Sequence, residues 1–431
     1  MQKQVRIWKS EELPSDWFKR QKTDEKSVQE VENSVKAIIK KVKENGDGAL
    51  VEFALEFDKA ELNTRVLRVR PEEFKEAYTK TSPDQISALK FMKERVSNFQ
   101  KQQLTQTEIN SSGDGICILT VLRPIESVGC YIPGGQAAYP SNLIMTAIPA
   151  KVAGVPRIVV CSPSDAKGKV NPLVLVAADM CGVDEVYKVG GAQAIAALAY
   201  GTKSIKSVRK IVGPGSKYVT MAKVLVSTDV AIDMPAGPSE VLVLADESAD
   251  ARFIAFDMVS QAEHGGDSVA GLITTSEKVA LQVQEKLSVV AALAERSEKV
   301  SEALAKYGFI IVCKSMEEAI SLVNQFAPEH LEVITAKPKE IAEKLTAGLI
   351  LLGPYSPVAL SDYGSGTNHV LPTGGFAQSF SGLSTLDFMR RVSIVEGSRT
   401  GLERVKDSIK IIAEAENLPN HYKAILARLE K

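Results

Sequence analysis

Apolar and polar residues alternate along the chain in two ways, which separate a helical beginning from a longer mixed region. Over 27–46 apolar residues recur at the helical period, and a helix is predicted there. Ser27 and Glu30 fit a capping box at its start, and Gly46 fits a left-handed stop at its end. A second helix is predicted over 83–103 from the same period. The chain is therefore expected to begin with helices.

Short runs of strand composition follow, and helical stretches separate them. One run lies at 116–121. A first series then predicts strands at 128–132, 157–161, 185–189, 210–212 and 230–232, and a second predicts them at 241–244, 269–274, 309–312, 331–335 and 348–352. The intervening helices are predicted at 143–152, 173–180, 193–200 and 217–226, and at 251–263, 276–293, 316–326 and 338–346. Strands with few polar interruptions, alternating with helices, are typical of a parallel sheet covered by helices. The predicted fold class is α/β, with two such units in tandem.

This pattern divides the chain into four parts. We expect an N-terminal mainly helical segment at 1–118, α/β units at 119–236 and 237–376, and a polar C-terminal tail at 377–431. Within the tail, helices are predicted at 401–414 and 422–429.

Composition and charge exclude several classes of protein. Apolar residues make up 45% of the 431 residues and charged ones 24%, which is ordinary for a folded protein. Lys and Arg number 52 against 53 for Asp and Glu, so the net charge of −1 offers no field for a nucleic-acid backbone. Neither a secretory signal nor an apolar run of membrane-spanning length is visible. We expect a soluble, cytoplasmic protein with neither nucleic acid nor membrane as partner.

The five cysteines fit the same compartment. They are odd in number, form no Cys-x-x-Cys pair and lie in or beside apolar runs. Reduced, buried thiols of a cytosolic protein have this distribution.

Glycine turns at predicted strand ends raise the question of a nucleotide. The chain has neither Gly-x-Gly-x-x-Gly nor a P-loop motif, so P-loop hydrolysis is disfavoured and dinucleotide binding is left unproven by motif alone. Three glycine turns, at 134–135, 190–191 and 213–215, nevertheless open predicted helices. Helix starts at the carboxyl ends of parallel strands offer N–H groups to anions. Tight turns without a ligand explain the same glycines.

Histidine is rare enough to be informative. The four histidines are His264, His330, His369 and His421. His264 ends a predicted helix three residues after Gln261, and His330 follows Glu329 directly. His369 follows a glycine-rich loop, and His421 lies five residues after Glu416. Such settings suit metal binding or proton transfer, although a structural histidine explains each one separately and no His-Glu-x-x-His motif is present.

Other chemistries have less support. Cys130 beside Tyr131 is either a thiolate nucleophile for aldehyde oxidation or an inert strand cysteine. Ser239 is not in a Gly-x-Ser-x-Gly elbow, which argues against serine hydrolysis. Asp233 ends a strand, and the sequence leaves open whether it is structural or functional.

Taken together, these segments resemble histidinol dehydrogenases. The resembling blocks run in the family's order and are 131–135, 189–195, 231–240, 261–264, 327–331 and 362–373. The resemblance implies two tandem incomplete Rossmann-like units with parallel sheets, preceded by the helical segment and followed by a helical dimerisation tail. It also implies oxidation of L-histidinol to L-histidine through L-histidinal with two NAD⁺, the last step of histidine biosynthesis, with one Zn²⁺ per active site.

The family's site residues carry over by position. The implied zinc ligands are Gln261, His264, Asp362 and His421, and substrate contacts add Ser239, Glu329, His330 and Glu416. The implied NAD⁺ contacts are Tyr131, Gln193 and Ser216. Ser216 departs from the asparagine expected after Gly213-Pro214-Gly215, but it keeps a short hydrogen-bonding side chain.

The resemblance further implies a homodimer in which the tail completes the neighbouring active site with Glu416 and His421. His330 is then expected to accept the hydroxyl proton, and Glu329 to activate water for the second oxidation. Two alternatives are a dehydrogenase of this fold acting on another small alcohol, and a nonenzymatic protein that retains metal or nucleotide binding.

Overall fold

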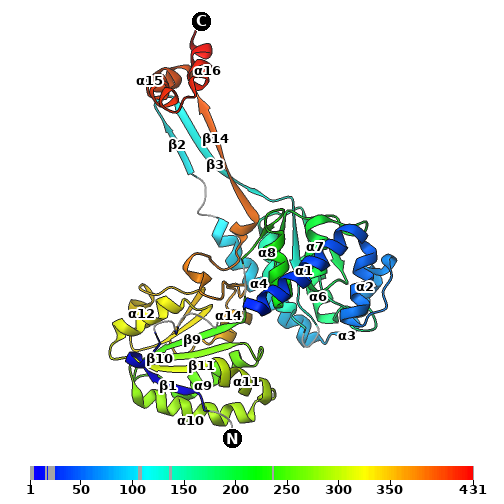
Figure 1. Cartoon of the computed structure of the whole chain (residues 1–431), viewed down its shortest axis with the longest axis vertical. Helices are drawn as coiled ribbons and strands as arrows, with labels where there is room; N and C mark the ends of the chain where they lie inside the picture. The colour runs from blue at the N-terminus through cyan, green and yellow to red at the C-terminus, as the bar shows by residue number, and fades with distance from the viewer. Residues whose placement is uncertain are drawn as a thin grey trace.

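The computed structural model describes residues 4–14, 17, 25–104, 109–134, 138–234 and 237–430. Two α/β bodies lie side by side, and a slender arm projects from them to the C-terminus (Figure 1). The predicted turn residue Gly135 and the predicted boundary residue Ala236 lie outside the described residues.

The first body is built on a five-stranded parallel sheet of order β6-β5-β4-β7-β8. Its strands are β4 Ser127–Tyr131, β5 Arg157–Cys161, β6 Glu185–Tyr187, β7 Lys210–Val212 and β8 Ala231–Ile232. Strand β4 is buried along its whole length, as a central strand covered on both faces must be. The chain adds strands on one side of β4 and then on the other, so the strand order reverses between β4 and β7. Doubly wound folds usually bind ligands beyond the carboxyl ends of the strands at such a point.

Helices cover both faces of this sheet. They are α1 Glu25–Asn45, α2 Asp47–Asp58, α3 Pro71–Lys80, α4 Pro83–Leu104, α5 Pro140–Val152, α6 Pro172–Cys181, α7 Gly191–Tyr200 and α8 Lys217–Val226. Helices α3 and α4 pack with α5 and α6 over one core, and α1 and α2 pack with α7 and α8 over the other. The N-terminal helices therefore complete the first body.

The sequence predicts the end of α1 correctly but not its start. The helix begins at Glu25, so Ser27 lies inside it and the predicted capping box is wrong. The stop is confirmed, because Gly46 has a φ of 52° and the helix ends at Asn45.

The second body contains a six-stranded parallel sheet of order β1-β11-β10-β9-β12-β13. Its strands are β1 Arg6–Lys9, β9 Glu240–Ala245, β10 Val269–Thr274, β11 Gly308–Val312, β12 His330–Ile334 and β13 Leu349–Leu352. Its helices are α9 Ala251–Ala262, α10 Glu277–Leu293, α11 Ser297–Tyr307, α12 Met316–Phe326, α13 Pro338–Ala342 and α14 Val358–Tyr363. Two tandem parallel α/β units are thus confirmed. Strand β1 and helices α11 and α14 are absent from the prediction.

The arm combines segments that are far apart in sequence. An antiparallel sheet of order β14-β3-β2 forms its stem, from β2 Ile109–Gly113, β3 Ile116–Pro124 and β14 Met389–Gly397. Helices α15 Arg399–Ala415 and α16 Pro419–Leu429 form its tip (Figure 1). The helical tail is confirmed, whereas β14 was not predicted. Short 3-10 turns lie at Ser10–Glu12, Thr64–Val66, Phe376–Gln378 and Thr385–Phe388.

A buried ion pair holds the turn that follows β7. Lys223 on α8 pairs with Asp233, and the two side chains are 3% and 1% exposed. Lys223 also donates to the carbonyl of Gly213 at 3.0 Å, and Asp233 accepts from the Gly213 N–H at 2.8 Å. Gly213 has a φ of 116°, and a Cβ there would strike the carbonyl of Tyr131. The sequence left open whether Asp233 is structural or functional. In the structure it fixes the turn at the carboxyl end of β7.

None of the helices in the described part of the chain has both the length and the apolar character needed to cross a membrane.

Replacing Lys223 by Met should destabilise the fold by about 3–5 kcal/mol, because Asp233 is then buried without a counter-charge. Urea unfolding measures the effect. The exposed Lys203→Met is the control and should change stability by less than about 0.5 kcal/mol. Equal unfolding midpoints for the two variants would mean that the ion pair does not hold the turn.

Candidate active site

The amino ends of two central strands bring two carboxylates together. Glu240 begins β9, and Glu329 immediately precedes β12, which pairs with β9 in parallel. Glu329 Oε2 accepts from the Glu240 N–H at 2.8 Å, and the Glu329 N–H donates to Glu240 Oε2 at 3.2 Å. A further N–H, from Gly374, donates to Glu240 Oε1 at 3.1 Å. Backbone donors therefore hold both carboxylates in fixed orientations.

His330 begins β12 and is 4% exposed. Its Nδ1 lies 3.3 Å from the carbonyl oxygen of Glu240 and 3.6 Å from Glu329 Oε2. With the proton assigned to Nδ1, the ring donates to that carbonyl and keeps a lone pair on Nε2. Within the described residues Nε2 has no hydrogen-bond partner, and it lies 3.7 Å from Asp362 Oδ1. The ring is thus oriented to accept a proton at Nε2.

The charges around His330 favour its protonated form. Burial alone lowers the pKa of the imidazole, but the neighbouring carboxylates of Glu329 and Asp362 outweigh it and raise the pKa above its usual value. An imidazolium formed during a reaction would therefore be stabilised where it stands.

Asp362, on α14, belongs to a segment that joins the two bodies. His369 Nδ1 lies 3.9 Å from Asp362 Oδ1, and His369 Nε2 contacts Asn142 Oδ1 at the start of α5. Asn368 donates to the carbonyl of Met145, also on α5, at 2.7 Å. Burial lowers the pKa of His369, which favours its neutral form. The second body's amino edge thus faces the first body's α5.

Three buried polar atoms at this edge lack partners among the described residues: Gln261 Nε2, His330 Nε2 and Asp362 Oδ1. Gln261 lies in the last turn of α9 and is 2% exposed. His264, just beyond α9, is exposed, and Ser239, just before β9, is half-buried. Buried polar atoms without a partner are rare in folded proteins and call for an explanation such as a bound ion, a water or a catalytic role. The carboxylate oxygen of Asp362 can bind zinc, whereas the Gln261 amide can do so only through its oxygen, because an amide N–H group donates and has no lone pair to offer.

The predicted zinc ligands are not all assembled within one chain. Gln261 and Asp362 lie at the amino edge of the second sheet, whereas His421 lies in α16 at the tip of the arm (Figure 1). Over the residues that the structure describes, no group of three His, Cys, Asp or Glu is placed to hold a metal ion. Within the described residues, one chain therefore does not bring the four predicted ligands together.

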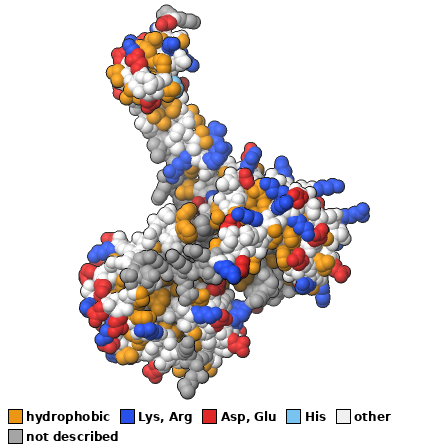
Figure 2. Space-filling view, in the orientation of Figure 1, with side chains coloured by type: hydrophobic (Ala, Val, Ile, Leu, Met, Phe, Trp, Pro, Cys, Tyr) orange, Lys and Arg blue, Asp and Glu red, His pale blue; other side chains and the backbone are white. Residues whose placement is uncertain are grey.

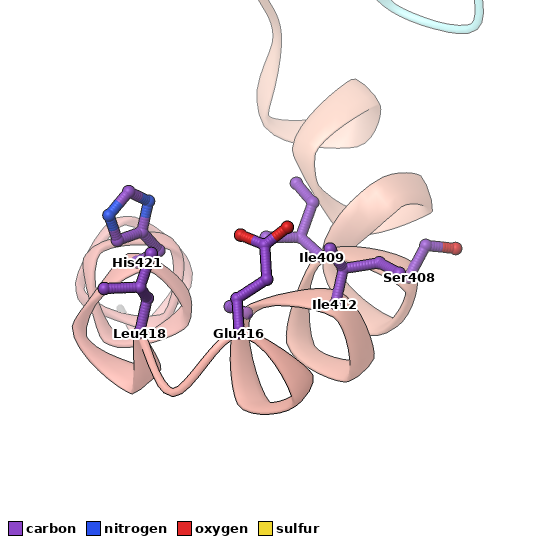
Figure 3. A pocket seen from close by; sticks show the side chains of 7 residues that line it. Ser408, Ile409, Ile412, Glu416, Leu418 and His421 are labelled. Atoms are coloured by element: carbon purple, nitrogen blue, oxygen red, sulfur yellow. The ribbon is translucent and has the colours of Figure 1, made fainter.

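His421 and Glu416 share a pocket of about 310 Å³ between α15 and α16. The other lining residues are Ser408, Ile409, Ile412, Ala413 and Leu418. Both side chains are exposed, and Figure 3 shows them rising on the same side of the helix pair. The arm thus presents an imidazole and a carboxylate outward.

The three predicted NAD⁺ contacts lie at the carboxyl edge of the first sheet. Tyr131 ends β4, and its hydroxyl accepts from the Gly191 N–H at 3.1 Å. Gln193, on α7, is buried, and its Oε1 has no donor among the described residues. Ser216 precedes α8, is exposed, and makes no capping hydrogen bond with its hydroxyl. Each follows the carboxyl end of a strand in this sheet: Tyr131 ends β4, Gln193 comes after β6 and Ser216 after β7.

The cysteines are free thiols; Cys130, Cys161, Cys181 and Cys313 are buried, whereas Cys117 is only half-buried. Burial raises the pKa of Cys130 to about 12, so the thiol stays protonated. This supports an inert strand cysteine over a nucleophile.

Glu240 and His369 are site residues to which the sequence assigned no role. Glu240 closes the quoted block 231–240, but only the β9–β12 pairing brings it to Glu329. His369 follows the glycine-rich loop, and its contact with Asn142 spans 227 positions. Neither contact can be predicted from the spacing of nearby residues, because each one joins segments that are far apart in the sequence.

The two tandem parallel units define an α/β protein, and the acid–imidazole group of the second unit lies beside the first. An acetylating aldehyde dehydrogenase from Geobacillus thermoglucosidasius shares the fold, with a TM-score of 0.50 at 15% identity over 88% of this chain and 99% of that one. A profile of the histidinol dehydrogenase family matches residues 20–429. The chain belongs to the histidinol dehydrogenase family and is an oxidoreductase.

Two relatives show how far the likeness extends. Histidinol dehydrogenase from Clostridium acetobutylicum is 47% identical over 93% of each chain. The crystal structure of histidinol dehydrogenase from Elizabethkingia anophelis gives a TM-score of 0.93 at 36% identity, over 99% of this chain and 98% of that one. The family resemblance of the sequence is confirmed.

Proposed function

We propose that this protein is a zinc-dependent, cytoplasmic L-histidinol dehydrogenase that oxidises L-histidinol to L-histidine through L-histidinal with two NAD⁺, the last step of histidine biosynthesis. The observation that carries the proposal is the buried imidazole of His330, fixed through Nδ1 and open at Nε2. Membership of the family supplies the substrate.

His330 is the base of both oxidations. Its Nε2 takes the hydroxyl proton of histidinol as a hydride leaves the carbinol carbon for NAD⁺. Glu240 holds the ring through the opposite nitrogen, and the carboxylates of Glu329 and Asp362 stabilise the imidazolium. The aldehyde and one NADH result.

Glu329 serves the second half of the reaction. Its carboxylate removes a proton from water as the oxygen attacks the aldehyde, and the protonated His330 returns its proton to the new alkoxide, which gives the hydrate and frees His330 to act again. Glu329 then loses its proton to solvent. A second hydride then leaves for a second NAD⁺, and His330 accepts the proton as the carboxylic acid forms. The N–H of Glu240 at 2.8 Å keeps the Glu329 carboxylate from turning away.

Gln261, His264 and Asp362 would hold zinc together with His421 of a second copy. Bound there, zinc supplies an anchor for the imidazole and amino nitrogens of the substrate. Ser239 and Glu416 add substrate contacts, and Tyr131, Gln193 and Ser216 contact NAD⁺ at the carboxyl edge of the first sheet. The unpartnered Oδ1 of Asp362 supports this assignment, and Gln261 would bind through its amide oxygen.

The arm is the dimerisation element of this proposal, with tail 377–431 crossing to the partner. Apolar side chains lie exposed along the stem and at the tip (Figure 2), among them Val395 at 64%, Ile411 at 66% and Ile412 at 59%. Exposed apolar surface of this kind is typical of an interface. In this arrangement the units 1–118, 119–236 and 237–376, apart from the arm strands β2 and β3, form the body of each subunit.

The proposed reaction should yield two NADH per histidinol, measured at 340 nm until the substrate is exhausted. Chelation of the metal should abolish turnover, and added zinc should restore it. A panel of other small diols provides the comparison. Turnover of a diol but not of histidinol by the zinc-loaded protein would favour the related-alcohol alternative, and turnover of neither would favour a nonenzymatic protein.

His330→Asn should reduce kcat by at least about 100-fold, because it removes the base but keeps a polar side chain of similar size. Zinc content, measured by atomic emission, should stay at the wild-type level. Loss of zinc from this variant would show that His330 belongs to the metal site instead.

Mixed dimers test the shared site. His264→Ala and His421→Ala should each be inactive, and mixing them under conditions of subunit exchange should restore one of the two sites in each mixed dimer. The expected recovery is up to about a quarter of wild-type activity, since half of the dimers are mixed. Exchange without recovery would contradict a site built from two chains.

A further inference from the structure

Two acidic side chains face each other one layer beneath the candidate active site. Glu332, in the middle of β12, is 1% exposed and lies between Val243 on β9 and Leu351 on β13. Asp257 on α9 makes a side-chain hydrogen bond with it. Within the described chain Glu332 Oε2 has no donor. Because two ionised carboxylates can only accept, this contact requires a proton between them.

Among the described residues, no Lys or Arg contributes to the charge environment of either acid. Glu332 Oε1 accepts from the Val358 N–H, the first of α14, at 2.8 Å. The other ionisable side chains on α9, α14, β9, β12 and β13 are Glu240, His330, Asp362, Tyr363 and Arg252. Helices α10 and α13 pack against α9 and β12, and their charged side chains are exposed. Arg252 is exposed and pairs with Asp250.

The ionisation of both acids reflects this setting. Burial, followed by the charge of Asp257, raises the pKa of Glu332 well above its usual value, and burial raises the pKa of Asp257 to about 6.

On each of three elements, a residue of this group lies one helical turn, or two strand positions, from an active-site residue. Asp257 is one helical turn before Gln261, so both lie on one face of α9. Glu332 is two residues after His330, so both point to one face of the sheet. Val358 is one turn before Asp362 on α14. The contacts among Asp257, Glu332 and Val358 therefore set the spacing of the next layer.

We propose that Asp257 and Glu332 share one proton, and that this carboxyl pair ties α9 and α14 to β12 and so positions Gln261 and Asp362 for zinc. The positioning half rests on the proposed function, whereas the shared proton does not. Both acids are positioning residues, since each acts through its neighbours on α9 and α14.

The shared proton is tested on metal-free protein by unfolding across pH 5–8, with Glu332→Gln as the matched variant. Its amide donates to Asp257 through N–H and still accepts from Val358, so no proton is needed. The folded wild type holds a proton that the unfolded chain releases above about pH 4.5, so its stability falls as pH rises. Relative to Glu332→Gln, the unfolding equilibrium constant of the wild type should rise by up to about tenfold per pH unit. Parallel curves would overturn the shared proton.

The positioning role is tested by zinc affinity in competition with a chelator. Asp257→Ala and Glu332→Ala should lose about 10–100-fold, as expected when groups behind metal ligands are removed. Glu332→Gln should stay within about threefold of wild type, and Glu285→Ala, on the exposed side of α10, is the control. Wild-type affinity in a folded Asp257→Ala would overturn positioning. A wild type that binds no zinc would instead refute the proposed function, with the pH result still standing.

Discussion

The reciprocal hydrogen bonds between Glu240 and Glu329 are the constraint on which the candidate site depends. They link the neighbouring parallel strands β9 and β12, although the two glutamates are 89 positions apart in the sequence. Each acid accepts from the other's backbone N–H, so two buried carboxylates are held side by side in fixed orientations. The carbonyl of Glu240 then fixes His330. Without this junction, the imidazole would have no defined direction.

The site is unusual in its position on the sheet. Ligands of doubly wound folds usually bind beyond the carboxyl ends of strands, and the predicted NAD⁺ contacts of the first body lie at such an edge. The acid–imidazole group lies instead at the amino ends of β9 and β12. Contacts from Asn368 and His369 to α5 bring this edge against the first body. The acid–imidazole group of the second body therefore lies beside α5 of the first body.

The sequence predicts the parallel sheets well because their strands are buried on both faces. The bounds of β5, β7 and β10 match the predicted runs residue for residue. Strand β14 escaped because it is largely exposed and pairs with β3 across some 270 positions, so neither an apolar run nor a local turn marks it. The predicted capping box is wrong because α1 already begins at Glu25, two residues before Ser27.

Some residues of the candidate site can be predicted from sequence motifs, whereas others depend on contacts between distant segments. Glu329 and His330 are adjacent in sequence and belong to a recognisable block, so they could be named in advance. Glu240, His369 and the Asp257–Glu332 pair act through contacts between distant segments, which single-residue patterns do not encode. His421 and Glu416 were predicted from the family resemblance. No spacing in the sequence indicates that they lie on an arm that projects away from the two α/β bodies of their own chain.

Anomalous diffraction at the zinc edge, on crystals of the zinc-loaded protein, tests the central claim most directly. The account predicts one strong peak per chain, about 2 Å from side-chain atoms of Gln261, His264 and Asp362 and from His421 of a second copy. A peak bound by one chain alone, or one with His330 as a ligand, would contradict it.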